Sequence, residues 1–190
     1  MSERLVEAIR AGGPVILPTD TVYGLCSDPS EDAVRELYRL KGRGAAQPTA
    51  LVAASEAAAV GAVPELRGQP FLRGAFTLIL PNPARRLPWL TGERPETIGV
   101  RIPDLTGEAR VVVDEVGVVA ATSANLPGGP DPHRLDDVPL ELREGAAAEL
   151  DGGELPGTPS TVIDLTGPEP VVLREGAVST ADALARLAIA

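Results

Sequence analysis

One lysine stands apart among the basic residues of this chain. Sixteen of the 17 basic residues are arginine, and only Lys41 is lysine. A lysine presents a compact ammonium that meets a phosphate or a carboxylate as a point charge, whereas an arginine presents a planar fork. Because Lys41 is followed by Gly42 and Arg43, it is typical of a cationic pair for a phosphate. A cation at the negative pole of a helix dipole is the simpler alternative.

A second candidate lies in residues 18–25, which read PTDTVYGL directly after an apolar run. Hydroxyl, carboxylate and phenol groups at the end of a buried strand are well placed to contact a polar ligand at the sheet edge. The Thr and Asp side chains of such a segment also cap the backbone of an ordinary turn. The sequence leaves both interpretations open.

Three further groups of polar residues adjoin expected strands. Residues 121–125 read ATSAN, and Ser123 and Asn125 could contact a ligand or cap the following turn. Ser160 adjoins another strand, and Arg174 follows the next one. Arg101 is a cation within an apolar run, so it requires either a protein carboxylate or an anionic ligand.

Helices and strands must position these residues. The spacing of the apolar residues predicts short strands that alternate with amphipathic helices. We expect a helix capped by Ser2 and ended by Gly12–Gly13, and a second from Ser30 to about Lys41–Gly42. Two more helices are expected over 109–116 and 179–188, the last with a cap at Thr180. Strands are expected at 15–17, 49–53, 76–80, 98–102, 118–122, 161–165 and 171–173. This alternation predicts an α/β domain with a twisted, helix-covered sheet.

Length and composition bound the class of protein. With 190 residues, 44% of them hydrophobic, and a net charge of −10, the chain fits a single domain over 1–190. It has no apolar run that could span a bilayer and no signal-peptide pattern, so we expect a cytoplasmic location and no membrane partner. One cysteine and one histidine exclude the usual His/Cys zinc sites, and we expect no protein-bound metal site. The proline-rich loops 81–95 and 126–139 are expected at the surface.

Taken in order, the motifs resemble the YrdC/TsaC family of threonylcarbamoyl-AMP synthases. The resemblance extends from about Pro14 to Gly176. It rests on PTDTVYGL at 18–25, Lys-x-Arg at 41–43, TLIL at 77–80, GVRIP at 99–103, TSAN at 122–125 and PSTV at 159–162. Several ordered motifs together are far more specific than any one of them.

The resemblance implies a YrdC-like twisted mixed sheet with flanking helices around a central concave groove. It implies an enzyme that converts L-threonine, bicarbonate and ATP into threonylcarbamoyl-AMP and pyrophosphate, with Mg²⁺ accompanying the ATP. A downstream threonylcarbamoyl transferase would then modify tRNA. Direct binding of tRNA is less favoured, because a net charge of −10 opposes broad affinity for nucleic acid.

The same resemblance implies roles for individual residues. Lys41 and Arg43 would hold the ATP phosphates and act as the catalytic pair. The threonine-binding residues would be Thr21, Tyr23, Arg101, Ser123 and Ser160. The other ATP-binding residues would be Gln47, Thr97, Asn125 and Arg174. No residue is identified as a general base, and catalysis would rest on positioning and electrostatic stabilisation.

Three departures from the family pattern bear on activity. Gln47–Pro48 stands where the family usually has Lys-Pro or Asn-Pro, Arg73–Gly74–Ala75 replaces Pro-Gly-Pro, and Pro127–Gly128 replaces Ser-Gly. Two alternatives therefore stay open. One is a YrdC-like paralogue that uses carbamate and adenylate chemistry on another amine. The other is an RNA-binding YrdC-like module.

Overall fold

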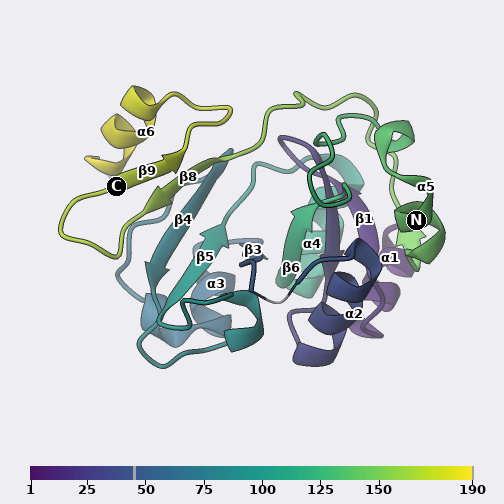
Figure 1. The fold of residues 1–190 in the computed structure, drawn as a ribbon, viewed down its shortest axis with the longest axis horizontal. Coiled ribbons are helices and arrows are strands. Elements are labelled where there is room, and N and C mark those ends of the chain that lie inside the picture. The colour runs from purple at the N-terminus through teal and green to yellow at the C-terminus, as the bar shows by residue number, and fades with distance from the viewer. Residues whose placement is uncertain (45, 190) are drawn as a thin grey trace.

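The computed structural model describes residues 1–44 and 46–189, which form a mixed sheet with helices on both faces (Figure 1). Across the sheet the strand order is β7-β1-β2-β6-β3-β5-β4-β8-β9. Three neighbouring pairs are parallel (β1 with β7, β3 with β5, β4 with β8) and the others are antiparallel. The strands are β1 (Val15–Pro18), β2 (Tyr23–Ser27), β3 (Ala50–Ala53), β4 (Phe76–Pro81), β5 (Thr97–Arg101), β6 (Val118–Ser123), β7 (Ala148–Glu149), β8 (Thr161–Asp164) and β9 (Val171–Arg174). The predicted α/β fold with a twisted mixed sheet is confirmed.

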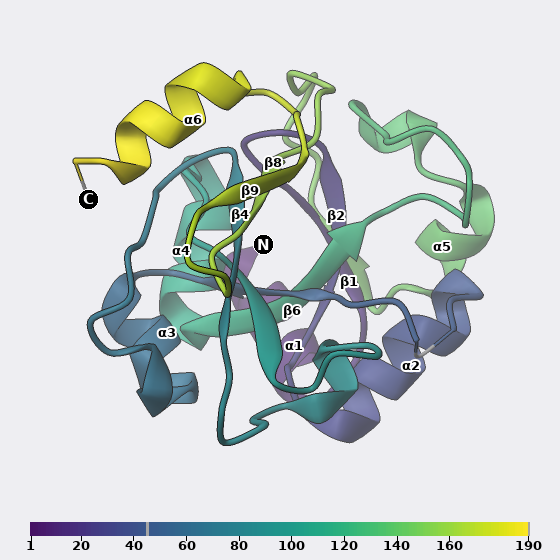
Figure 2. The same ribbon diagram turned by 60° about the vertical axis from the view of Figure 1, so that its left-hand side comes forward.

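Two apolar clusters hold the helices against the sheet. One contains residues of α1, α4 and the strands β1, β2, β3 and β6. The other contains residues of α2, α3, α5 and α6, and Figure 2 shows these four helices spread around the periphery of the strands. The helices are α1 (Ser2–Arg10), α2 (Glu31–Lys41), α3 (Glu56–Ala62), α4 (Gly107–Val116), α5 (Leu140–Gly145) and α6 (Thr180–Leu187).

Most of the expected elements are present, with small shifts at their ends. The structure adds β2, β7, α3 and α5, which the sequence did not predict. The sequence did not predict strand β2, because the polar residues after Pro18 favoured a loop that contacts a ligand. The chain instead turns at 19–22 and returns as β2, antiparallel to β1 with Leu17 opposite Gly24. The loops 81–95 and 126–139 each contain a short 3-10 turn, at Pro88–Leu90 and Leu135–Asp137.

The predicted helix caps are partly corrected. Ser30 is the N-cap residue of α2, and Gly42 ends that helix in the left-handed conformation with φ 64°. However, Ser2 is already helical and follows an N-cap at Met1. Ser179, rather than Thr180, caps α6, because its side chain accepts a hydrogen bond from the backbone N–H of Asp182.

Strand register places a row of small side chains across the middle of one face. Side chains alternate between faces along a strand, so directly opposed residues share a face. The pairings join Cys26 to Ala121, Ala121 to Ala50 and Gly99 to Ile79, and Gly99 lies beside Ala50. The neighbouring row is bulkier, and contains Val119, Val52, Arg101, Thr77 and Val162. The row of small side chains leaves room for a ligand above it.

Candidate functional site

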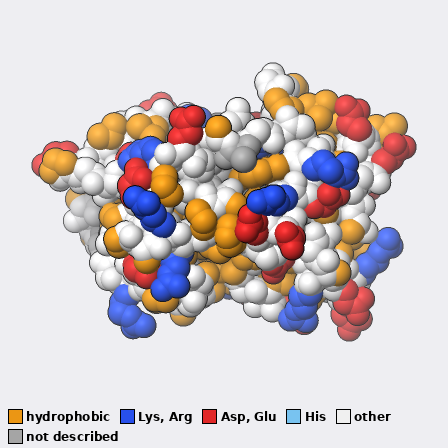
Figure 3. All heavy atoms as spheres, turned by 60° about the horizontal axis from the view of Figure 1, so that its bottom comes forward, with side chains coloured by type: hydrophobic (Ala, Val, Ile, Leu, Met, Phe, Trp, Pro, Cys, Tyr) orange, Lys and Arg blue, Asp and Glu red, His pale blue; other side chains and the backbone are white. Residues whose placement is uncertain are grey.

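A cavity of about 610 Å³ lies over this face of the sheet. Its wall includes the small residues Gly24, Ala50, Gly99 and Ala121 together with apolar and hydroxyl side chains. Figure 3, in which the bottom of Figure 1 comes forward, shows hydrophobic side chains along the middle of the visible surface of the molecule, with charges of both signs on either side. Seven of the residues predicted for the site line this cavity: Thr21, Arg43, Thr97, Arg101, Ser123, Ser160 and Arg174.

Lys41 lies behind the cavity wall rather than on it. Its side chain is only 3% exposed, and its Nζ donates to the backbone carbonyl of Ser123 and, over 2.8 Å, to Oδ1 of Asn125. Burial lowers the pKa of Lys41 to about 8, with a further lowering from Arg43 and an opposing effect from Asp131. An ammonium has three donors, so one N–H remains beyond these two bonds.

Arg43 reaches the cavity from the turn after α2. Its Nη1 donates to Oγ1 of Thr122 over 2.7 Å, and its Nη2 donates to the backbone carbonyl of Pro48. Its Nε is buried without a partner in the described residues. Burial also lowers the pKa of Arg43. An anionic ligand would accept from the N–H groups that these bonds leave on Nη1 and Nη2, and would compensate the half-buried charge.

Arg101 projects from β5 and is paired with a protein carboxylate. Its Nη2 donates to Oδ1 of Asp20 and, over 2.9 Å, to Oγ1 of Thr21. The side chains of Arg101 and Asp20 are only 11% and 12% exposed. Oδ2 of Asp20 also accepts the backbone N–H of Asp104 over 2.9 Å. The Nε of Arg101 is buried and has no partner in the described part of the chain.

Ser160 and Arg174 form the opposite wall, at the strands β8 and β9. Nη2 of Arg174 donates to the backbone carbonyl of Ser160 over 2.9 Å. The hydroxyl of Ser160 lies 2.8 Å from Oγ1 of Thr77 on β4. Ser160 is buried, whereas Arg174 is exposed. These contacts fix a hydroxyl and a guanidinium side by side at the cavity wall.

Asn125 and Gln47 do not line the cavity. Oδ1 of Asn125 accepts from Lys41 and from Oγ of Ser123, over 2.8 and 2.7 Å. Its Nδ2 donates to the backbone carbonyl of Gly129, so the amide is engaged within the protein on both sides. Gln47 is exposed on the loop before β3. The structure therefore places Asn125 as a support for Lys41.

Tyr23, which the resemblance implied as a threonine-binding residue, also lies away from the cavity. Its side chain is fully buried, and its hydroxyl donates to the backbone carbonyl of Gly153 over 2.8 Å and accepts from Gly152 over 2.9 Å. Alternation along β2 explains this placement, because Gly24 and Cys26 face the cavity while Tyr23 and Leu25 pack into the other cluster. Burial raises the pKa of the Tyr23 hydroxyl.

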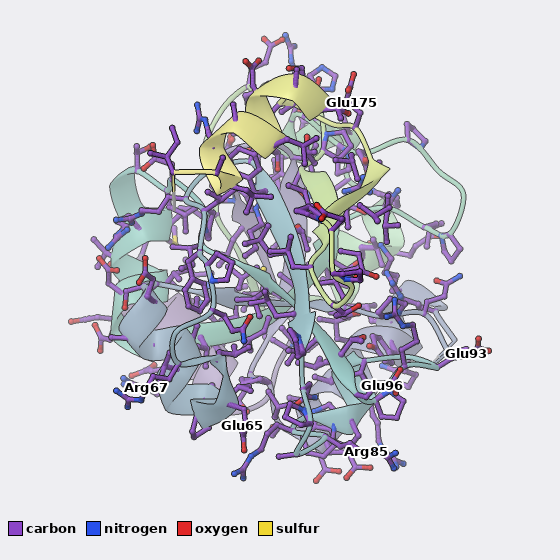
Figure 4. The ribbon with its side chains drawn as sticks, turned by 90° about the vertical axis from the view of Figure 1, so that its left-hand side faces the viewer. Glu65, Arg67, Arg85, Glu93, Glu96 and Glu175 are labelled. Atoms are coloured by element: carbon purple, nitrogen blue, oxygen red, sulfur yellow. The ribbon has the colours of Figure 1, made fainter. Side chains whose placement is uncertain are left out.

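Sequence reasoning missed several residues that complete the site. Asp20, the partner of Arg101, was visible as the one carboxylate in the segment after β1. Thr122, which supports Arg43, lies within the TSAN motif. Asp131 and Glu93 supply carboxylates to the cavity from two loops, and no sequence signal identified either. Figure 4 shows Glu93 and Glu96 on one edge of the molecule, far from Glu175 beside α6.

Within residues 1–44 and 46–189, no cluster of three or more His, Cys, Asp or Glu side chains could hold a metal ion. No helix in the same part of the chain is long and apolar enough to cross a membrane.

The fold and the cavity define a class of protein: an α/β domain with an arginine-lined cleft over a mixed sheet. The Sua5/yciO/yrdC family model, whose description is telomere recombination, matches residues 7–176, and the chain belongs to this family. A putative threonylcarbamoyl-AMP synthase of Mycobacterium tuberculosis is 37% identical, over 92% of this chain and 83% of its own length. A threonylcarbamoyl-AMP synthase of Stenotrophomonas maltophilia is 39% identical, over 81% of this chain and 89% of its own.

Solved structures agree with this assignment. The crystal structure of Pyrococcus abyssi Sua5 complexed with L-threonine superposes with a TM-score of 0.82 at 33% identity. The match covers 95% of this chain and 55% of the Sua5 chain, so this chain spans little more than half of that protein. The crystal structure of Escherichia coli YciO superposes with a TM-score of 0.78 at 25% identity, over 94% of this chain and 90% of that one.

Proposed function

We propose that this protein is an L-threonylcarbamoyladenylate synthase, a nucleotidyltransferase that forms threonylcarbamoyl-AMP and pyrophosphate from L-threonine, bicarbonate and ATP. One observation carries the proposal: one cavity is lined by two arginines from different elements, half-buried Arg43 and largely buried Arg101. Two guanidinium groups in one cleft can donate hydrogen bonds to two substrates that each carry an anionic group and that must meet. The family membership and the relatives named as threonylcarbamoyl-AMP synthases support the same activity.

The ATP phosphates belong at Lys41 and Arg43 in this proposal. After their protein contacts, Lys41 keeps one N–H and Arg43 keeps one N–H at each of Nη1 and Nη2. Buried cations that approach pyrophosphate stabilise the charge that develops as it leaves the α-phosphorus. Thr97 and Arg174 would contact the rest of the nucleotide from the opposite wall, and exposed Gln47 would reach it from the rim.

Threonine belongs at Arg101, with its carboxylate on the free edge of that guanidinium. The hydroxyls of Thr21, Ser123 and Ser160 line the same cavity and would orient the amino and hydroxyl groups of the substrate. The threonine amine first becomes a carbamate, and a carbamate oxygen then attacks the α-phosphorus of ATP. The protein contributes by holding the two reactants in line, which removes most of the entropic barrier to their encounter.

Mg²⁺ fits this cavity as an ion carried by the phosphates of ATP. The cavity offers single carboxylates rather than a cluster, and Asp131, which acts electrostatically on Lys41, is the one we assign to it. When bound, Mg²⁺ would neutralise negative charge on the phosphates.

The product would be used by a downstream threonylcarbamoyl transferase that modifies tRNA, and we place this step in the cytoplasm. In this proposal the tRNA contacts the downstream enzyme, because the cationic groups described here line a small-molecule cavity.

Pyrophosphate release from ATP, measured with each amino acid in turn and with and without bicarbonate, tests the proposal. We expect release that requires both L-threonine and bicarbonate, together with a threonylcarbamoyl-AMP product identified by mass spectrometry. Release with another amine, and none with threonine, would show a paralogous activity instead. Salt-dependent tRNA binding that persists when ATP fills the cavity, without any pyrophosphate release, would show an RNA-binding module.

A further inference from the structure

The deepest part of the cavity wall is apolar. Six wall residues are at most 9% exposed and belong to one apolar cluster with α1 and α4. We call this part of the wall the inner end: Leu17, Cys26, Val52, Leu105, Val113 and Val119. The proposed roles of the polar wall residues leave the inner end without a use.

Arg101 borders the inner end but adds little net charge to it. It lies directly opposite Val52 in the register of β3 and β5 and acts electrostatically on Cys26. Its charge is cancelled by Asp20, whose side chain is equally buried. Nη1 of Arg101 makes no hydrogen bond among the described residues, and in the proposed function this edge of the guanidinium holds the carboxylate of threonine. The inner end is therefore apolar and close to neutral.

We infer that the inner end receives the one-carbon substrate as CO₂ rather than as the bicarbonate anion; this inference rests on the proposed function. An anion placed among these six side chains would lose its hydration and gain no net opposite charge, which is strongly unfavourable. CO₂ is small, linear and uncharged, so it suits an apolar end that opens onto the threonine site.

The chemical step balances with CO₂ alone. The neutral amine of threonine attacks the carbon, one C–N bond forms, and one C=O π bond shifts its electron pair to oxygen. The amine then releases a proton to solvent at the mouth of the cavity, and the product is a carbamate. The new negative charge develops on an oxygen beside the guanidinium of Arg101, which can stabilise it. Bicarbonate would have to lose hydroxide in the same place.

The inference is tested by supplying the carbon either as CO₂ or as bicarbonate and measuring the rate before the two forms equilibrate. Full-length protein with ATP and L-threonine is mixed rapidly, at low temperature, with CO₂-saturated water or with fresh bicarbonate at equal total carbon. We expect an immediate burst of pyrophosphate with CO₂ and a lag with bicarbonate. Carbonic anhydrase equilibrates the two forms, so its addition should abolish both the burst and the lag. An immediate rate with bicarbonate and a lag with CO₂ would overturn the inference while leaving the proposed function intact. No pyrophosphate from either source would overturn the proposed function itself.

A pair of matched variants assigns the preference to the inner end. Val119→Thr places a hydroxyl in the inner end at nearly constant volume, whereas Val112→Thr places one in the same apolar cluster but off the cavity wall. We expect Val119→Thr to raise the apparent KM for CO₂ at least about fivefold with the KM values for ATP and threonine unchanged. Val112→Thr should leave all three KM values unchanged, although it also lowers stability. Equal KM values for CO₂ in the two variants would contradict the assignment.

Discussion

Nζ of Lys41 donates a 2.8 Å hydrogen bond to Oδ1 of Asn125, and it also donates to the backbone carbonyl of Ser123. The end of α2 is thereby joined to the end of β6 through the only lysine in the sequence. Two acceptors that lie two residues apart fix the ammonium in one position. Lys41 is consequently a preorganised cation, which is the condition under which a charge stabilises a transition state most effectively.

Lys41→Arg should lower the turnover of pyrophosphate release at least about tenfold, equivalent to roughly 1.4 kcal/mol in the barrier. The charge is kept, but a planar guanidinium cannot occupy the pocket formed by the Ser123 carbonyl and the Asn125 amide. Steady-state kinetics with ATP and threonine measure the effect. Arg39→Lys at an exposed position of the same helix is the control and should retain full turnover. Near-normal activity in Lys41→Arg would remove the special role assigned to lysine.

The affinity for ATP should fall as pH rises through about 8, the pKa to which burial lowers Lys41. Phosphate binding needs the protonated ammonium, so ATP binding takes up a proton where free Lys41 is neutral. Calorimetric titrations across this pH range, in buffers of different ionisation enthalpy, measure both affinity and proton uptake. Lys41→Arg should lose this pH dependence, because an arginine stays charged. A flat profile in the unmodified protein would contradict the prediction.

The same lowered pKa predicts how stability depends on pH. Between a pKa of about 8 in the folded state and the ordinary lysine pKa of 10.5, the unfolded state binds more protons than the folded state at this residue. The contribution of Lys41 therefore makes the free energy of unfolding rise as pH increases through that window. Denaturant unfolding of the free protein, compared with Lys41→Met, isolates this contribution, since Met has no charge to titrate. An equal pH slope in the two proteins would count against it.

Tyr23→Phe should lower the free energy of unfolding by about 1–2 kcal/mol, because it removes the partner of the Gly152 N–H and of the Gly153 carbonyl. The KM for threonine should stay unchanged, since Tyr23 lies on the face away from the cavity. Urea unfolding and threonine kinetics on the same preparation give both values. A rise in the threonine KM without loss of stability would restore Tyr23 to the site.

Asp20→Ala should destabilise the protein by about 3 kcal/mol, because it leaves the buried guanidinium of Arg101 without its carboxylate. Glu31→Ala is the matched control: it removes the partner of Arg35 in an exposed pair and should cost about 0.5 kcal/mol or less. Thermal and urea unfolding measure the two differences. Similar losses for both variants would mean that burial of the Arg101 pair has little energetic effect.

Local signals in the sequence predicted much of the fold. The helix over 31–41 follows from its cap at Ser30, the acids of its first turn and a glycine at its end. Strand β2 escaped prediction because Tyr23–Ser27 is short and directly follows polar residues that suit a loop equally well. Its status depends on the hairpin with β1 and on pairing with the distant strand β6, and the pairing with β6 leaves no local trace.

The sequence by itself determined the identity of the chemical groups: a lone lysine, two arginines and a set of hydroxyls within ordered motifs. Residue type and spacing suffice for this, because charge and hydrogen-bonding capacity belong to each side chain. Only the tertiary structure decided which groups meet. It turned Tyr23 away from the cavity, placed Asn125 beneath Lys41 and paired Arg101 with Asp20. Those relationships depend on strand register and on contacts between residues some 80 or more positions apart, which only folding brings together.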